Sequence, residues 1–295
     1  MKELAELLDV RKSLLNFLQE DIGSGDITSN SIISPNISVR AEIICRAKTR
    51  AIVCGLEEAS IIFNICKCKT QILVKDGSNV GRGDIVMSIK GKAHSILKAE
   101  RTAVNLIMRM SGIATETRRI IEIIRDINYP IRIASTRKTA PGLRFFDKKA
   151  VRTGAGDTHR MRLDDMIMIK DNHLMITHSV KRSVELARKV AGSSIKVECE
   201  VKNLEEAIAA INAGAQIVML DNFSPEEAAK TIKEITKRGI RKNTRIELSG
   251  GINLRNIKYY AKAKPDVISI GYLTHSAKAI DYSLEIVDVP RQSSI

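Results

Sequence analysis

The sequence has no tryptophan, and aromatic residues make up only 3% of its 295 positions. Proteins that bind single-stranded nucleic acids use aromatic side chains as stacking platforms, so this scarcity argues against that class. The net charge of +14 points the other way, but many lysines and arginines lie on amphipathic segments such as VKRSVELARKV (180–190), where solvated side chains are expected. We therefore predict no nucleic-acid partner, and a basic nucleic-acid-binding protein is the alternative from another class.

Long hydrophobic runs and a cysteine framework are also missing. No apolar stretch approaches about 20 residues, so neither a membrane span nor a membrane partner is expected. The opening Met1-Lys2-Glu3 begins a helix-like segment and is not typical of a signal peptide. The 5 cysteines are an odd number without metal-ligand spacing, which argues against a disulfide framework and a zinc site. These absences predict a cytoplasmic protein with reduced thiols.

The pattern of apolar residues changes near residue 112. Residues 1–112 combine a helix-like start with strand-like runs and Gly/Asp turns, which predicts an antiparallel sheet with packed helices. In residues 113–275, helical segments alternate with short apolar runs at 131–135, 166–169, 195–201, 217–220, 245–248 and 267–270. Such βα repeats predict a parallel sheet, and we favour a barrel because no G-x-G-x-x-G follows the first run. We expect residues 276–295 to pack back on the first domain.

Polar residues follow almost every one of these apolar runs. The first run leads to Arg137 and Lys138, and the second ends at Lys170. The third carries Glu198 and Glu200 near its end, and the fourth ends at Asp221. In a βα barrel the carboxyl ends of the strands converge on one mouth, where active sites are built. The cations, joined by His159 and Arg160 from a loop, predict a mouth for an anionic ligand.

The same mouth has candidates for a metal and for phosphate. Glu200 and Asp221 suit Mg²⁺, which usually keeps several waters and is shared with substrate phosphates. The turns in LSGGIN and SIGYLTHS (248–253 and 269–276) place glycine between a strand and a helix start, where backbone N–H groups bind phosphate. In barrels such sites often follow the last two strands. His275 lies close to the second of these turns in the sequence.

Several segments, taken together and in order, resemble the quinolinate phosphoribosyltransferase family: EDIGSGDIT, AERTAVNLIMRMSGIAT, TRKTAPGLR, KAVRTGAGDTHRMRLDDMIMIKDNH, VECEV, VMLDN, ELSGGIN and ISIGYLTHSA. The resemblance covers nearly the whole chain. It implies an α/β fold with an N-terminal α/β sandwich followed by an incomplete, open α/β barrel of TIM type. It also implies a magnesium-dependent transferase that converts quinolinate and phosphoribosyl pyrophosphate to nicotinate mononucleotide, pyrophosphate and CO2 in de novo NAD synthesis. The implied assembly is a homodimer with shared active sites, and a hexamer is possible.

The resemblance also implies roles for individual residues. Arg101 would reach into the site of the neighbouring subunit. Lys138, Glu200 and Asp221 would be catalytic, with Glu200 and Asp221 facing the metal and the ribose. The full set of implied substrate-binding residues is Arg101, Thr136, Arg137, Lys138, His159, Arg160, Lys170, Glu200, Asp221, Ser249, Gly250, Gly251, Ile270, Gly271, Tyr272 and His275.

Four positions depart from what the family pattern leads us to expect: Ala140, Ala155, Thr158 and Tyr272. None of them removes a charge from the predicted site, so they affect fine substrate contacts and not the reaction. The closest alternative is a paralogous phosphoribosyltransferase-like protein of molybdenum-transport operons, which shares the barrel and takes a different substrate. The retained RKT, HR, IKDNH and SGG segments favour quinolinate.

Overall fold

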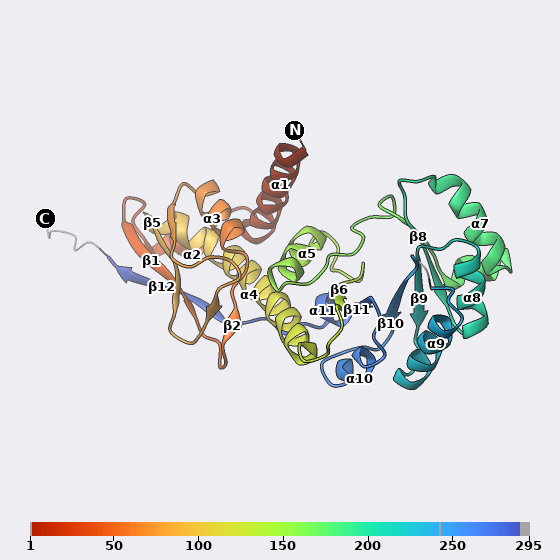
Figure 1. Ribbon diagram of the computed structural model, residues 1–295. Coiled ribbons are helices and arrows are strands. Elements are labelled where there is room, and N and C mark those ends of the chain that lie inside the picture. Colours follow the sequence, from red (N-terminus) through yellow and green to blue (C-terminus); the bar gives the residue numbers. More distant parts are fainter. Residues whose placement is uncertain (1, 242, 290–295) are drawn as a thin grey trace, which may run out of the picture. The chain divides into compact units, whose positions relative to one another are not determined.

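A computed structural model describes residues 2–241 and 243–289 of the chain (Figure 1). It divides into two compact units. The first unit comprises residues 1–116, 141–154 and 277–295, and the second comprises residues 117–140 and 155–276. Within the described ranges, no helix combines the length and the apolar character needed to span a membrane.

The first unit is built on an antiparallel sheet of 4 strands in the order β12-β1-β5-β3. The strands are β1 (Ser38–Cys45), β3 (Lys69–Ile72), β5 (Ile85–Lys92) and β12 (Tyr282–Asp288), and a small second sheet pairs β2 (Ala51–Ile52) with β4 (Asn79–Val80). Strand β1 buries every second residue, from Val39 to Cys45, so one face of the sheet supplies the core. Because β12 pairs with β1, the described part of the C-terminal segment packs on the first unit as expected, and residues 290–295 lie outside the described residues.

Five helices contribute to this unit: α1 (Lys2–Ile22), α2 (Ile27–Ile32), α3 (Leu56–Ile65), α4 (Ala93–Ile124), whose last turns belong to the second unit, and α5 (Arg144–Thr153). Gly112 lies where α4 passes the backbone of Lys278. A Cβ atom on Gly112 would come within 2.3 Å of the Lys278 carbonyl oxygen, so no larger residue fits at this contact.

Helix α5 departs from the domain boundaries that the sequence suggested. Residues 113–275 were expected to form one continuous catalytic domain, but 141–154 belong to the first unit. The physical reason is that Phe146 and Val151 join the apolar core of that unit. In addition, the buried Asp147 accepts two hydrogen bonds from Arg109 of α4, at 2.7 and 2.9 Å.

The second unit contains a parallel sheet of 6 strands in the order β6-β11-β10-β9-β8-β7. These strands are β6 (Arg132–Ala134), β7 (Ile167–Ile169), β8 (Val197–Val201), β9 (Ile217–Asp221), β10 (Arg245–Ser249) and β11 (Val267–Ser269), and each lies within, or one residue beyond, a predicted apolar run. Strands β6 and β7 form the two edges, so the sheet is open. The predicted fold class, an α/β sandwich unit and an incomplete α/β barrel, is confirmed.

Helices of the second unit follow the strands: α6 (Asp171–Thr177), α7 (Val180–Ala191), α8 (Leu204–Asn212), α9 (Pro225–Lys237), α10 (Ile257–Ala261) and α11 (Tyr272–His275). In Figure 1, α8 and α9 lie beside β8 and β9, and Ala210 and Ile235 of these helices join the apolar core under the sheet. Helix α9 begins with a capping box in which Ser224 and Glu227 bond reciprocally, followed by Pro225 at the first helical position.

Candidate active site

A cavity of about 440 Å³ opens at the carboxyl ends of the parallel strands in the second unit. It brings together most of the residues that the sequence placed at the mouth. The predicted residues that line it are Thr136, Arg137, Lys138, His159, Arg160, Lys170, Glu200, Asp221, Ser249, Gly250 and Gly251. Residues spread over more than 110 positions of the chain therefore meet at one surface, as a barrel mouth requires.

An adjoining cavity of about 200 Å³ is lined by the two glycine turns, together with Tyr272 and His275. Gly250 has φ of +100°, and a Cβ atom there would lie 2.2 Å from the Asn222 side-chain oxygen, so this turn needs glycine. Gly271 precedes α11 and lies close to the Lys138 side chain. The turns place backbone N–H groups beside a cation, which is an arrangement that suits a phosphate.

Two predicted residues lie elsewhere. The Ile270 side chain is buried in the apolar core of the second unit, and its backbone N–H donates to the Ala134 carbonyl at 2.8 Å. Arg101 lies on α4 in the first unit with 60% of its side chain exposed, 3.8 Å from the Glu100 carboxylate. Its contact with a neighbouring subunit stays a prediction.

The cations of the larger cavity have few acceptors of their own. Arg160 is buried, and its guanidinium donates one long hydrogen bond of 3.5 Å to the Met166 carbonyl. Burial lowers the pKa of Arg160, and the nearby positive charge of Arg137 lowers it further. The Arg137 Nε atom is itself buried without a hydrogen-bond partner in the described structure. Buried donors without acceptors indicate that an anion completes this site.

Lys170 is the exception among these cations. Its ammonium donates to Glu200 Oε1 at 2.7 Å, across the ends of β7 and β8. The pair is half-exposed at the lysine, so we assign it little stability on its own. The hydrogen bond fixes the direction of the Glu200 carboxylate, and Lys170 still lines the cavity.

His159 is held by the backbone on one side and by carboxylates on the other. The segment before it pairs with β6 in a single parallel bridge, because Asp157 N–H donates to the Ile133 carbonyl and Ser135 N–H donates to the Asp157 carbonyl. The Asp157 side chain then accepts from His159 N–H at 2.7 Å, in a turn where His159 has φ of +51°. The loop is thereby locked with the imidazole over the barrel interior.

Beneath His159 lie two fully buried carboxylates that the sequence analysis did not select. Glu247 Oε2 lies 3.1 Å from His159 Nε2, and Glu198 Oε2 lies 3.5 Å from the same nitrogen. Burial raises the pKa of Glu198 well above its ordinary value, and the adjacent Glu247 carboxylate raises it further. A signal existed, since alternation along VECEV puts Glu198 on the same face as Glu200, and RIELS does the same for Glu247 and Ser249.

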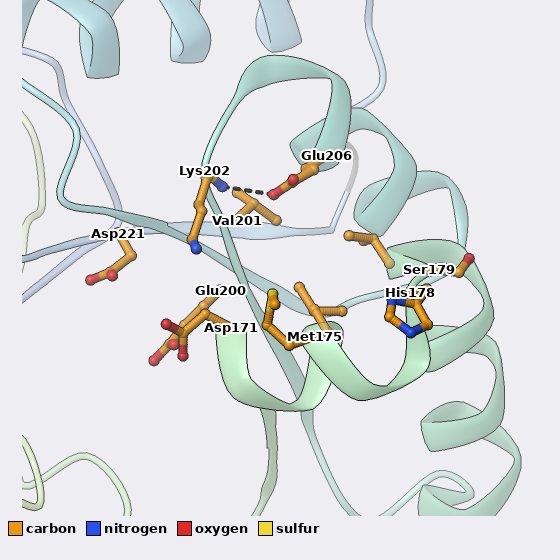
Figure 2. A pocket seen from close by; sticks show the side chains of 11 residues that line it. Asp171, Met175, His178, Ser179, Glu200, Val201, Lys202, Glu206 and Asp221 are labelled. Atoms are coloured by element: carbon orange, nitrogen blue, oxygen red, sulfur yellow. Dashed lines mark hydrogen bonds between the residues drawn. The ribbon is translucent and has the colours of Figure 1, made fainter.

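Glu200 and Asp221 satisfy the simple requirements of a magnesium site. They end neighbouring strands, and both also line a further cavity of about 270 Å³ bounded by α6, where Figure 2 shows them with Asp171. One Glu200 oxygen accepts a hydrogen bond from Lys170, and one Asp221 oxygen accepts a hydrogen bond from Asn222. The second oxygen of each carboxylate is available to a cation. Among the described residues, neither belongs to a cluster of three or more metal-ligating side chains. A cation here would need oxygens from substrate or water, which is how magnesium is usually held.

Comparison with known proteins agrees with this geometry. Residues 26–111 match the model of the N-terminal domain of quinolinate phosphoribosyl transferase, and residues 113–285 match the model of its C-terminal domain. The chain belongs to the quinolinate phosphoribosyl transferase family. This confirms the resemblance seen in the sequence motifs.

Relatives within the quinolinate phosphoribosyl transferase family span almost the whole chain. The probable nicotinate-nucleotide pyrophosphorylase [carboxylating] of Methanothermobacter thermautotrophicus is 42% identical, covering 95% of this chain and 99% of its own. The human nicotinate-nucleotide pyrophosphorylase [carboxylating] is 36% identical over 83% of this chain and 84% of its own. The solved nicotinate-nucleotide pyrophosphorylase of Francisella tularensis superposes with a TM-score of 0.85 at 37% identity, covering 95% and 96% of the two chains.

The four positions that depart from the expected quinolinate phosphoribosyl transferase pattern differ in their surroundings. Tyr272 lines the smaller cavity. Thr158 and Ala140 flank cavity-lining segments, and the Thr158 carbonyl accepts from the Ser135 hydroxyl at 3.4 Å. Ala155 adopts φ of +73°, a conformation that favours glycine. Of the four departures, Tyr272 is therefore the one whose side chain lines a cavity, and Ala155 is the one with a strained backbone.

Proposed function

We propose that this protein transfers the phosphoribosyl group of phosphoribosyl pyrophosphate to quinolinate, forming nicotinate mononucleotide, pyrophosphate and CO2 for de novo NAD synthesis. The observation that carries the proposal is the 440 Å³ cavity in which Arg137, Lys138, Arg160 and Lys170 face two strand-end carboxylates. Quinolinate is a dianion and its co-substrate carries several phosphate charges. A cavity with four cations matches that load, and arginine binds carboxylates through two parallel hydrogen bonds.

The two cavities divide the binding task. The glycine turns and Lys138 of the smaller cavity are suited to the 5′-phosphate. His159 and Arg160 line only the larger cavity and are suited to the pyridine dicarboxylate. Glu200 on β8 and Asp221 on β9 are the residues that would hold magnesium. When bound, the metal would neutralise the pyrophosphate leaving group.

The chemistry then needs orientation and charge, and no covalent nucleophile. As pyrophosphate departs, positive charge develops at C1′ of the ribose, and the carboxylates of Glu200 and Asp221 stabilise it electrostatically. The ring nitrogen of quinolinate attacks C1′ and becomes cationic. Loss of the adjacent carboxylate as CO2 leaves the electron pair of the broken bond on C2, where the neighbouring cationic nitrogen stabilises it until a proton from solvent is added at C2. Arg137 and Arg160 hold the dicarboxylate so that the nitrogen faces C1′.

We propose a homodimer as the working unit, with Arg101 completing the site of the neighbouring subunit, and a hexamer as a higher assembly. The cytoplasm is the proposed compartment. The exposed Arg101 side chain supports an intermolecular role, because its nearest anion is the adjacent Glu100 at 3.8 Å. Mixing Arg101→Ala subunits with Lys138→Ala subunits should restore part of the activity that each variant lacks alone. Absence of rescue in mixed oligomers would contradict sharing.

The substrate assignment is tested by competition. Purified protein is incubated with phosphoribosyl pyrophosphate, Mg²⁺ and either quinolinate or nicotinate, and mononucleotide formation is measured. We expect product from quinolinate alone. Product from nicotinate, or from neither acid, would contradict the substrate assignment, and the second outcome would favour the molybdenum-operon paralogue.

A further inference from the structure

The carboxylate pair beneath His159 is the most unusual buried feature of the second unit. Glu198 of β8 and Glu247 of β10 are both completely inaccessible to solvent. Glu198 Oε1 and Oε2 and Glu247 Oε1 have no hydrogen-bond partner within the described residues. Buried carboxylates without partners are costly, and the interior of an α/β barrel is ordinarily filled by branched apolar residues. Such a pair needs a reason beyond packing.

The contact of the pair with His159 supplies that reason. Glu247 Oε2 and Glu198 Oε2 face a single imidazole nitrogen, Nε2, at 3.1 and 3.5 Å. A nitrogen lone pair directed at the Glu247 carboxylate would be repelled, whereas an Nε2–H group donates to it, with Glu198 nearby. The surroundings therefore select the forms of the imidazole in which Nε2 carries the proton.

The backbone fixes the remaining freedom of the ring. His159 N–H is bonded to Asp157, and the residue has φ of +51°. With the backbone held from one side and Nε2 from the other, the rotamer is determined. Nδ1 makes no hydrogen bond to any residue in ranges 2–241 and 243–289. It is thus the ring nitrogen available to a ligand in the 440 Å³ cavity that His159 lines.

A metal ion is a competing explanation, since one ligand atom from each of His159, Glu198 and Glu247 lies within 4.8 Å of the others. The buried guanidinium of Arg160 argues against it. Burial and the adjacent Glu247 raise the pKa of Glu198, and the positive charge of Arg160 opposes part of that rise, so the guanidinium lies close enough to act on this carboxyl. A divalent cation added beside this buried arginine would meet like-charge repulsion in a site with little solvent screening.

We propose that Glu247, supported by Glu198, is a positioning residue that holds His159 with Nε2–H directed into the barrel and Nδ1 directed to the cavity, where Nδ1 donates to the pyridine dicarboxylate when it too carries a proton. The role assigned to Nδ1 rests on the proposed function, whereas the orientation of the ring does not. Glu198 does not line the cavity, whereas Glu247 does, beside His159. Both act through the imidazole.

The first test is spectroscopic and needs no activity. Long-range ¹H–¹⁵N correlation spectra of the wild-type protein report which ring nitrogen is protonated in each of its 5 histidines, and the signals lost in His159→Gln identify His159. We expect a protonated Nε2 on His159. An unprotonated Nε2, including one bound to a metal, would overturn the proposal even if the protein is fully active.

The second test uses a pair of substitutions. Glu247→Gln keeps an acceptor for Nε2–H, whereas Glu247→Leu removes it. We expect the Gln variant to keep the His159 spectrum and a kcat/KM for quinolinate within about threefold of wild type. The Leu variant should lose the spectrum and about 10- to 100-fold in kcat/KM, mainly through the KM for quinolinate, because a hydrogen bond to a charged group is lost.

A matched control separates positioning from stability. Ile246→Val lies on the same strand with its side chain in the apolar core, so it should lower stability without changing the His159 spectrum or either KM. If Glu247→Leu behaves like Ile246→Val, the positioning role is overturned. If the wild-type spectrum is as expected and quinolinate is not turned over, the proposed function fails while the ring orientation stands.

Discussion

Each unit of this protein contains a cluster of buried or partly buried charges, and the two clusters are built differently. In the first unit, Lys149 of α5 contacts Glu57 at 2.6 Å and Glu58 at 2.8 Å, and its ammonium also lies 3.8 Å from Asp76. In the second unit, Glu198 and Glu247 share one imidazole nitrogen and leave three oxygen atoms unbonded. The first cluster holds a lysine in direct contact with its carboxylates. In the second, no described lysine or arginine forms an ion pair with Glu198 or Glu247, and Arg160 acts on Glu198 only through its nearby charge.

The difference distinguishes a structural cluster from a functional one. Asp76 accepts hydrogen bonds from the backbone N–H groups of Gly55 and Leu56 at the start of α3, so the Lys149 cluster joins α5 to a helix terminus. The Glu198–Glu247 pair joins no helix terminus. It contacts a cavity-lining histidine, and Glu247 also lines the cavity itself. The poor hydrogen bonding of the pair is tolerable because the site gains a fixed ring. Strain of this kind tends to gather at functional sites.

The largest expected effect concerns the cavity cations. Arg160→Ala should lower kcat/KM for quinolinate by about 10²- to 10³-fold, because a charge-assisted contact in a poorly solvated site is lost. The thermal midpoint should change little, since among residues 2–241 and 243–289 Arg160 makes one long hydrogen bond of its own. Steady-state kinetics and calorimetry on the same preparation check both expectations. A large drop in the midpoint with unchanged turnover would assign Arg160 to the structure.

The opposite pattern is expected for the first unit. Lys149→Met removes the cation from among three carboxylates, one of which, Glu58, is almost fully buried. Stability should fall by about 3 kcal/mol, because the remaining buried charge is uncompensated. Denaturant unfolding measures this loss. The control is Lys181→Met, which changes an exposed side chain on α7 and should change stability by less than about 0.5 kcal/mol. An unfolding curve like that of the control would show that the cluster contributes nothing.

A pH series sharpens the contrast at Glu198. Its pKa is raised in the folded state, so the folded protein binds more protons than the unfolded chain just above pH 4.5. Glu198 therefore makes wild-type stability fall as pH rises through that region. Glu198→Gln should remove this contribution, so its stability relative to wild type should grow from pH 4.5 upward. A difference that is constant with pH would contradict the raised pKa.

A smaller effect is expected in the loop that leads to His159. Ala155→Gly should relieve the left-handed backbone at φ of +73°, and we expect a gain of up to about 1 kcal/mol, partly offset by the freer unfolded chain. Kinetic constants should stay at wild-type values. Denaturant unfolding decides, and a loss of stability would mean that the Ala155 methyl group contributes packing that outweighs the strain.

The sequence was informative where function depends on strand ends. Short apolar runs followed by Lys170, Glu200 or Asp221 located both the parallel strands and the cavity, because each signal is local. Two features escaped. Helix α5 lies between barrel elements in the sequence, yet it packs on Arg109 and Glu58, which are distant along the chain. Glu198 and Glu247 lie inside apolar runs, where a single charged residue gives no local sign of its partner. Their contact with His159 exists only in the tertiary structure.

The function proposed for the cationic cavity is a phosphoribosyl transfer coupled to decarboxylation. The most direct measurement uses quinolinate labelled at the carboxyl group on C2, with release of labelled CO2 followed in the presence and absence of phosphoribosyl pyrophosphate. The account predicts one labelled CO2 for each nicotinate mononucleotide formed, no release without phosphoribosyl pyrophosphate, and a loss of release of about 10²- to 10³-fold in Arg160→Ala. Labelled CO2 released without phosphoribosyl pyrophosphate, or none released with it, would contradict the claim.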